Sequence, residues 1–373
     1  MIPPLDPTTL SPAAQKLVSS SAPEKLQEVA ARGIAPGLRP GEVLAVLLLL
    51  GVSPRPAIQA AAQKTLSALP EQVLSGALGT DLPPQVIDAL ARTYSHRFEV
   101  LEKLVTMPRI DPGTVEDLAK EGTEQVTEFL ATNEERLLAN PRIIERLYLN
   151  KRTRMSTADR LVELAVRNRI ELTGLPAWKE MQQAIKDELI CEPTPEPTPQ
   201  DIAFRETQEL AERLAGADAE EDTHDETEEG KEELRKKFLP LYKRIAEMTV
   251  SEKIRAAMLG SREERMLLVR DNNRIVASAV VRSPLMQESE AALISRNRNM
   301  TDEVLRVIGS TPELVKSYMV KKNLVENPKT PVMIATRLIQ HLRETDLKHL
   351  AKSKNVTGPV KDAARRHLER RNN

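Results

Sequence analysis

A leucine-led phrase recurs at least five times along this chain and limits the fold more than any other feature. In each copy, a leucine is followed by Asn, Pro, Lys or Arg residues, by a helix start, and by small or branched apolar residues at positions eleven and fourteen. The copies begin at Leu104, Leu147, Leu293, Leu324 and Leu350. The last copy departs from the pattern, with Lys361 at position eleven. Because residues three apart share one helix face, which is buried only when neighbouring helices stack on it, the phrase predicts stacked helical repeats.

The composition favours helices over strands. Hydrophobic residues make up 40% of the 373 residues, yet only four Phe, four Tyr and one Trp are present. A core of Leu, Ala, Val and Ile suits closely packed helices, whereas strands are usually rich in aromatic and β-branched residues. The predicted fold class is therefore all-α, an α-solenoid of helical repeats in two blocks.

The cysteine count and the apolar runs indicate where such a chain resides. Cys191 is the one cysteine, so an intramolecular disulfide is excluded and a reducing compartment is favoured. No basic residue adjoins Cys191, which predicts an inert thiol. No secretory signal follows Met1, and the longest apolar run, residues 43–52, is too short to span a bilayer. We therefore expect a cytoplasmic protein without membrane insertion.

Charge divides the chain unevenly. Residues 192–233 contain sixteen acidic and three basic residues, a net charge of −13, whereas residues 234–373 contain 29 basic and 15 acidic residues, a surplus of +14. The acidic segment opens with a Pro-Thr run, continues through a short predicted helix over 201–215, and ends in a stretch too polar to order itself. The predicted parts are an irregular lead-in (1–22), an N-terminal helical-repeat domain (23–191), a partly disordered acidic linker (192–233) and a basic C-terminal helical-repeat domain (234–373). Pro and Gly residues delimit predicted helices over 24–33, 40–50, 54–68, 70–77 and 84–94.

Residues 53–69 (SPRPAIQAAAQKTLSAL) resemble the second helix of a HEAT repeat. The apolar and small positions of that pattern are filled by Ile58, Ala61, Ala62, Thr65 and Leu66. The five leucine-led copies are similar to HEAT-like or variant leucine-rich α-helical repeats. This resemblance implies a helical-repeat fold and, by itself, no activity.

Enzyme signatures are missing from the sequence. The sequence contains five histidines: His96, His224, His341, His349 and His367. None of them is paired at metal-ligand spacing. The fourteen glycines do not form a phosphate-binding loop, and a Gly-x-Ser-x-Gly motif is absent. We therefore expect a non-enzymatic protein with no metal and no cofactor.

Arginines at predicted helix ends of the basic domain form the first candidate binding set. It consists of Arg270, Arg274, Arg282, Arg296 and Arg298. In a helical-repeat protein such positions recur on one edge, where cations can neutralise the phosphates of a nucleic acid. Only Phe238, Tyr242 and Tyr318 are available in this domain to stack on bases, which disfavours single-strand recognition. A protein partner, a solvated surface, or docking of the acidic segment itself suits the same arginines better.

Asparagines in the predicted loops form the second set. Asn297, Asn299 and Asn327 could build a polar ladder that reads an extended peptide, or they could serve as turn and capping residues. The two interpretations predict different losses on substitution: binding in the first case and stability in the second.

The function that fits these features best is that of a scaffold or adaptor whose helical-repeat surface binds another protein. The alternative is nucleic-acid binding through the basic C-terminal domain. A further hypothesis is that the acidic segment folds back and screens that domain, because the two opposite charges adjoin. The sequence predicts neither the identity of the partner nor the oligomeric state.

Overall fold

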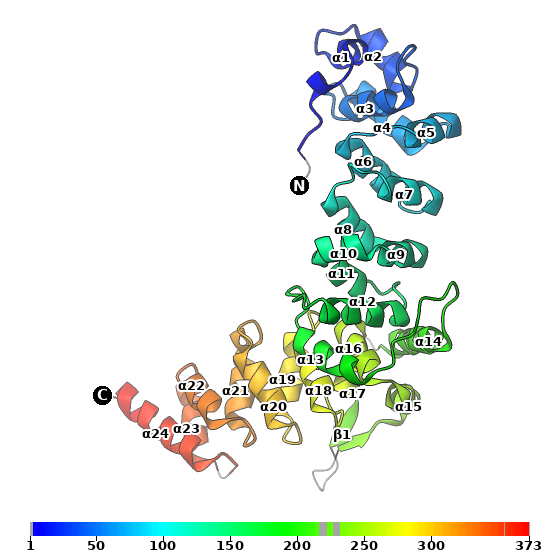
Figure 1. Ribbon diagram of the computed structural model, residues 1–373. Coiled ribbons are helices and arrows are strands. Elements are labelled where there is room, and N and C mark those ends of the chain that lie inside the picture. The colour runs from blue at the N-terminus through cyan, green and yellow to red at the C-terminus, as the bar shows by residue number, and fades with distance from the viewer. Residues whose placement is uncertain (1–2, 216–221, 227–231, 354, 373) are drawn as a thin grey trace. The chain divides into compact units, whose positions relative to one another are not determined.

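The computed structural model describes residues 3–215, 222–226, 232–353 and 355–372 (Figure 1). Within these residues the chain forms 24 α-helices, four short 3-10 helices and one two-stranded sheet. The all-α prediction is therefore confirmed. Among these helices, none is both long and apolar enough to cross a membrane.

The chain divides into two compact units, Met1–Arg154 and Met155–Asn373. We call them the N-terminal unit and the C-terminal unit and describe each by itself. This division differs from the sequence-based one, because the acidic segment 192–233 lies inside the C-terminal unit and not between two domains.

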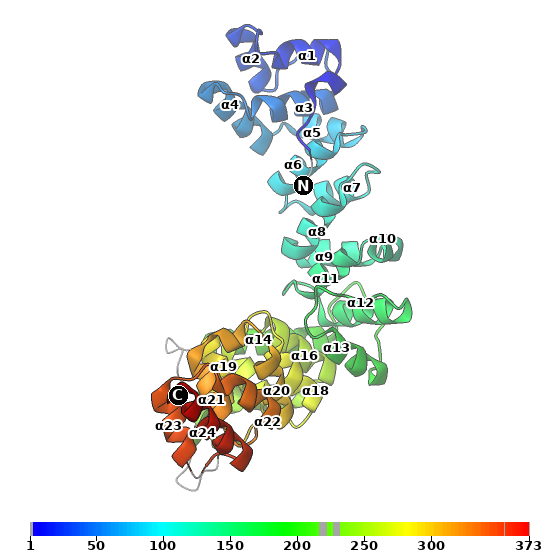
Figure 2. The same ribbon diagram turned by 90° about the vertical axis from the view of Figure 1, so that its left-hand side faces the viewer.

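The N-terminal unit consists of eleven short α-helices within its described residues (Figures 1 and 2). They are α1 (Pro12–Val18), α2 (Glu24–Ala31), α3 (Pro40–Leu50), α4 (Pro56–Ser67), α5 (Glu71–Leu78), α6 (Pro84–Thr93), α7 (Phe98–Val105), α8 (Pro112–Glu121), α9 (Glu124–Ala131), α10 (Glu134–Ala139) and α11 (Pro141–Tyr148), with a 3-10 helix η1 at Pro7–Thr9. Proline opens six of them, at a position where its missing N–H is not needed.

The five helices predicted over residues 24–94 are present, and each end lies within two residues of the prediction. The lead-in 1–22 is less irregular than predicted, because it contains α1. Ser11 caps this helix by accepting a hydrogen bond from the Ala14 backbone N–H at 3.4 Å, and Ala14 is fully buried where α1 packs against α3. Ser11 followed by Pro12 is therefore a helix start, which was overlooked because the segment is rich in Pro and Ser.

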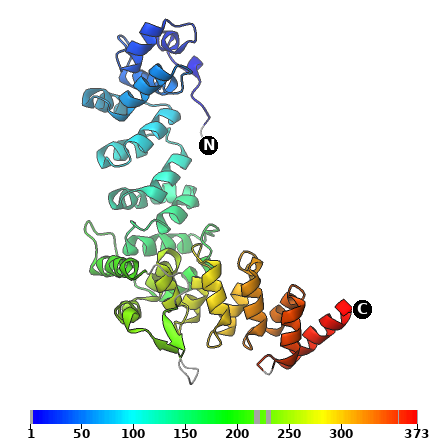
Figure 3. The ribbon, with the colours of Figure 1, turned by 180° about the vertical axis from the view of Figure 1, so that it is seen from behind.

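The C-terminal unit contains the remaining helices and the sheet (Figures 1 and 3). The α-helices are α12 (Met155–Arg167), α13 (Trp178–Ala184), α14 (Pro199–Leu214), α15 (Leu239–Glu247), α16 (Val250–Leu259), α17 (Arg262–Leu268), α18 (Arg274–Val281), α19 (Glu288–Arg296), α20 (Asp302–Ser310), α21 (Tyr318–Glu326), α22 (Val332–Ile339), α23 (Glu344–Lys352) and α24 (Gly358–Asn372). The 3-10 helices are η2 (Ile185–Asp187), η3 (Lys236–Phe238) and η4 (Leu314–Lys316), and the strands are β1 (His224–Glu226) and β2 (Glu232–Leu234).

The acidic segment contributes a packed helix to this unit. α14 packs against α12, α15 and α17, and it buries Phe204, Thr207 and Ala211 along one face. Its start is fixed by a capping box between Thr198 and Asp201, whose carboxylate also accepts from the Ser156 N–H at 2.8 Å. The predicted disorder in this segment falls largely on residues 216–221 and 227–231, which lie outside the described residues.

The leucine-led phrase spans the end of one helix and the beginning of the next. Of the five leading leucines, four are fully buried, and Leu293 is half-buried. The apolar residues at positions eleven and fourteen are buried in the copies that follow Leu104, Leu147, Leu293 and Leu324, and Ala364 is buried in the last copy. The phrase therefore marks core positions on both sides of an interhelical loop, as its spacing predicts.

Helices of the C-terminal unit pack in succession. α16 packs against α18, α18 against α20, α20 against α22 and α22 against α24, while α19 packs against α21. A buried ion pair joins α17 to α19: Arg265 Nε and Nη2 donate to the two carboxylate oxygens of Glu290 at 3.0 and 2.9 Å. The Glu290 side chain is 0% exposed and that of Arg265 is 5% exposed, so this pair belongs to the core.

Candidate functional site

Three interhelical loops of the C-terminal unit contain most of the predicted binding residues. They follow α17 (residues 269–273), α19 (residues 297–301) and α21 (residues 327–331), and we call them together the loop edge. The buried Asn327 joins the second and third loops, because its amide Nδ2 donates to the carbonyl oxygens of Ser295 and Asn297, both at 2.9 Å. Asn323 reinforces the same junction by donating to the Ala292 carbonyl at 2.8 Å.

Each loop is folded by a side-chain oxygen that accepts from the backbone two residues later. Asn297 Oδ1 accepts from the Asn299 N–H at 2.7 Å, Asn327 Oδ1 from the Lys329 N–H at 3.0 Å, and Asp271 Oδ1 from the Asn273 N–H at 2.8 Å. These contacts are the turn chemistry that the sequence left open as one of two interpretations. They also fix the amide of Asn297 so that its Nδ2 group faces away from the turn.

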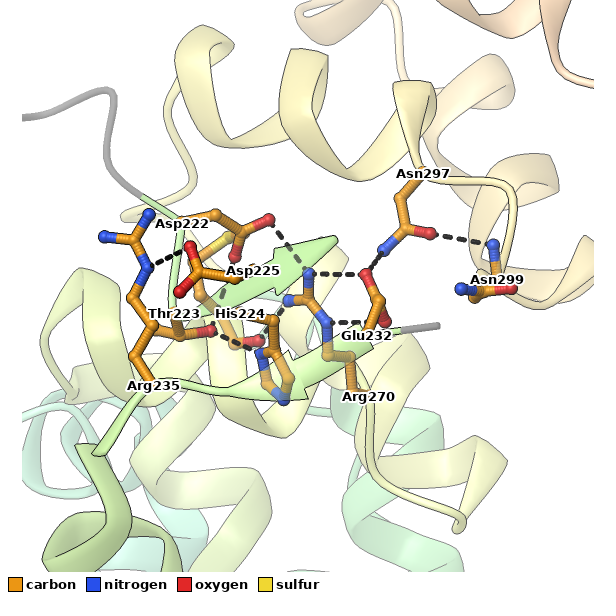
Figure 4. A network of polar contacts seen from close by, with 10 residues as sticks. Asp222, Thr223, His224, Asp225, Glu232, Arg235, Arg270, Asn297 and Asn299 are labelled. Carbon is orange, nitrogen blue, oxygen red and sulfur yellow. Dashed lines mark hydrogen bonds and ion pairs between the residues drawn. The ribbon is translucent and has the colours of Figure 1, made fainter. Parts of the chain in front are cut away.

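That outward amide and the guanidinium of Arg270 bind one carboxylate of β2 (Figure 4). Arg270 Nε and Nη2 donate to the two oxygens of Glu232 at 3.3 and 3.1 Å, and Asn297 Nδ2 donates to Glu232 Oε1. Arg270 Nη2 also donates to Asp222 at 2.9 Å, and Nη1 to the Met266 carbonyl at 2.8 Å. The loop edge therefore holds an acidic, extended segment of its own chain.

The segment is a short antiparallel hairpin. Its described part consists of β1, β2 and the residues beside them, with His224 opposite Leu234 and Asp225 opposite Glu233. Arg235 closes it twice, by donating its N–H to the Thr223 carbonyl at 3.1 Å and its Nε to Asp225 at 2.8 Å. Thr223 is buried, whereas His224 and Glu232 are half-buried. Charged and polar contacts therefore hold the hairpin in this place (Figure 4).

His224 lies within this network, which lowers the pKa of its imidazole. Its Nδ1 is 2.9 Å from the Thr223 hydroxyl. Burial lowers the pKa of His224 below its usual 6.5, and the positive charge of Arg270 lowers it further, against the opposing effect of Glu232, Asp222 and Asp225. The docked hairpin thus favours the neutral imidazole.

The other predicted residues divide into two groups. Arg296, Arg298 and Asn299 are exposed around Asn297, and Arg274 is exposed at the start of α18 beside the first loop. Arg282 lies at the opposite end of α18, where its Nε donates to Glu180 of α13 at 2.9 Å. Seven of the eight predicted residues thus lie on or beside the loop edge, and Arg282 does not.

A second polar site, around the start of α16, was not predicted from the sequence. Glu188 accepts from the Ser251 N–H at 2.7 Å and from the Thr249 hydroxyl at 3.3 Å, while the Ser251 hydroxyl donates to Asp159. Asp159 and Glu188 also line a cavity of about 510 Å³, together with Cys191 and Asn273. These carboxylates satisfy the free backbone and hydroxyl donors at a helix start, which is a structural role.

The charge state of Asp159 is unusual. Burial raises its pKa to about 7, and the neighbouring Glu188 and Glu252 also raise it, while the Ser251 hydroxyl and Arg255 oppose the rise. The pKa values of Glu188 and Glu252 are likewise raised, chiefly by burial. In the sequence STADRLVEL, Asp159 lies between Ala158 and Arg160, so no local signal pointed to its burial.

No protein-family model, no curated protein and no solved structure matches this chain.

Proposed function

We propose that this protein is a non-enzymatic adaptor of HEAT-like helical repeats, arranged as a solenoid, that binds a partner protein along the loop edge of the C-terminal unit. The observation that carries the proposal is the joining of successive loops into one edge by Asn327 and Glu232. Exposed cations accompany this edge at Arg296, Arg298 and Lys329. A row of donors and cations on rigid helix ends suits the recognition of a protein segment.

The test compares three forms of the full chain as immobilised bait. One is the natural sequence, and the second carries Arg296→Glu, Arg298→Glu and Lys329→Glu. The control carries Lys16→Glu, Lys25→Glu and Lys64→Glu, which reverse three exposed charges in the N-terminal unit. We expect the natural chain and the control to retain the same defined protein, and the loop-edge variant to lose it.

Nucleic-acid binding predicts a different result in the same experiment. The natural chain would be retained on duplex DNA with a steep dependence on salt, because each phosphate contact releases counterions. The loop-edge variant would lose that retention, and no defined protein would depend on the three cations. Such a result would replace the adaptor proposal.

A further inference from the structure

We infer that the hairpin of β1 and β2 occupies the place of the partner on the loop edge, and that the partner binds there through an acidic, extended segment that displaces the hairpin. This inference rests on the proposed adaptor function and names its partner class and its regulation. It follows from what the hairpin contacts, from what remains when it leaves, and from the charge it neutralises.

The hairpin is attached to the edge as a ligand would be. Its strands contain three residues each, and an isolated two-stranded hairpin is marginally stable in water. The hydrogen bonds and ion pairs that join its described residues to the loop edge are those of Asp222 and Glu232 with Arg270 and Asn297. These are contacts to side chains that any suitably placed carboxylate could make.

The donors that bind the hairpin are held in place by contacts outside it. The Asn297 amide is oriented by its contact with the Asn299 N–H, and Asn327 holds the Asn297 carbonyl in place. Arg270 is anchored through Nη1 to the Met266 carbonyl. When the hairpin leaves, the donors therefore remain in position to bind another carboxylate, which reduces the entropy cost of that binding.

Charge decides what can replace the hairpin. The Arg270 side chain is only 11% exposed, and a largely buried guanidinium left without a carboxylate is strongly disfavoured. The planar guanidinium binds a carboxylate through two parallel hydrogen bonds, and the Asn297 amide adds a third donor to the same oxygen pair. Exchange for another acidic segment is therefore favoured over simple opening.

The hairpin has an advantage over a free acidic segment in binding the loop edge, because it is part of the same chain. A tethered segment acts at an effective concentration on the order of millimolar, so a free segment of similar affinity is excluded until the hairpin is weakened. The carboxylates of Asp222 and Glu232 thereby neutralise Arg270 of the loop edge. The natural chain should consequently bind acidic segments weakly.

The test uses the full chain and a fluorescent peptide with the sequence of residues 222–235. The chain variant Asp222→Asn with Glu232→Gln weakens the internal hairpin. We expect it to bind the peptide at least tenfold more tightly than the natural chain does, and less tightly as salt is added. A peptide carrying the same two substitutions should not bind.

Three further variants make the result specific. Glu209→Gln with Glu233→Gln removes the same charge from exposed positions that do not contact Arg270, and it should leave peptide binding at the level of the natural chain. Adding Asn297→Ala or Arg270→Gln to the weakened variant should abolish the gain, with helicity measured by circular dichroism to confirm folding. Equal binding by the natural and weakened chains would overturn the inference, as would tighter binding of duplex DNA than of the peptide.

The outcome is separable from that of the adaptor proposal. If the peptide fails to bind while capture of a protein still depends on Arg296, Arg298 and Lys329, the adaptor proposal stands and the hairpin inference falls. If the peptide binds as expected but no protein depends on those cations, the edge binds acidic segments and the adaptor proposal falls.

Discussion

Arg265 and Arg270 lie five residues apart, and each guanidinium binds the two oxygens of a glutamate, yet the two sites differ in kind. The Arg265–Glu290 pair is 5% and 0% exposed and joins two helices of the core. The side chains of Arg270 and Glu232 are 11% and 20% exposed, and Glu232 belongs to a two-stranded hairpin. The same hydrogen-bond geometry therefore serves a permanent core contact in one case and an exchangeable contact in the other.

The difference lies in what else holds the carboxylate. Glu290 is carried by α19, a helix held by its own apolar face, and its Oε2 also caps that helix by accepting from the Gln287 N–H at 2.8 Å. Glu232 is carried by a strand of three residues. Breaking the first contact leaves a buried charge without any replacement, whereas the second can be replaced by another acidic segment.

The largest expected effect is therefore that of Glu290→Gln. Glutamine keeps the size of the side chain but leaves the Arg265 charge buried without its counter-charge, at a cost of about 3–5 kcal/mol. For a unit of this size, we expect a fall in melting temperature on the order of 10 °C. Circular dichroism measures the fall, and hydrogen exchange should place it in α17 and α19.

Glu303→Gln is the matched control. It makes the same chemical change in the exposed Arg306–Glu303 pair of α20, where side-chain exposure of 56% and 34% limits the contribution to about 0–1 kcal/mol. Equal shifts for Glu290→Gln and Glu303→Gln would show that burial does not distinguish these ion pairs.

The asparagines of the loop edge repeat the comparison on a smaller scale. Asn327 uses its Nδ2 to hold two carbonyls of the preceding loop, whereas Asn297 uses its Nδ2 for the hairpin. Asn327→Ala leaves buried polar groups without partners and should cost about 2 kcal/mol, while Asn297→Ala should cost about 1 kcal/mol or less. Urea unfolding measures both.

The N-terminal unit contains an asparagine that tests the expected difference between Asn327→Ala and Asn297→Ala. Asn150 makes the same contacts as Asn327, donating to the carbonyls of Ala119 and Gly122 at 3.0 and 3.1 Å. Its substitution by alanine should therefore resemble that of Asn327 in size. If Asn297→Ala proves as costly as the other two, the view of Asn297 as a binding residue is contradicted.

Many of the helix bounds and buried positions could be predicted from the sequence, because they depend on local signals. Proline and glycine residues delimited α3 to the residue, and the spacing of the leucine-led phrase identified buried positions. The loop sequences predicted two possible roles for Asn297 and Asn327, as turn residues or as a binding ladder. Choosing between these roles required the partners of each Nδ2, which lie some thirty or more residues away in the chain.

The hairpin had no such local signal. Its strands read His-Asp-Glu and Glu-Glu-Leu, and acidic residues are depleted in strands. Distant residues hold them, because Arg270 binds Asp222 beside β1 and Glu232 of β2, and Asn297 also binds Glu232. The packing of α14 was also missed, although the spacing of Phe204, Thr207 and Ala211 marks one apolar helix face. The strong negative charge around this helix suggested a linker and concealed that face.

The smallest expected effect tests whether the hairpin contact is exchangeable under mild conditions. Docking lowers the pKa of His224, so the free hairpin binds more protons than the docked one once the pH falls below about 6.5. Docking is therefore strongest above that pH and weakens as the pH falls toward the lower pKa of the docked state. The core pair of Arg265 and Glu290 contains no histidine.

We expect the affinity of the residue 222–235 peptide for the Asp222→Asn, Glu232→Gln chain to fall about two- to fourfold between pH 7.5 and pH 6.0. The groups that face His224 in the docked state are Arg270, Glu232, Asp222 and Asp225, and the first of these opposes its protonation. A peptide carrying His224→Gln should show a flatter pH dependence, since it lacks the titrating ring. Identical pH profiles for the two peptides would mean that His224 does not sense docking, and that the hairpin responds to salt and to acidic competitors alone.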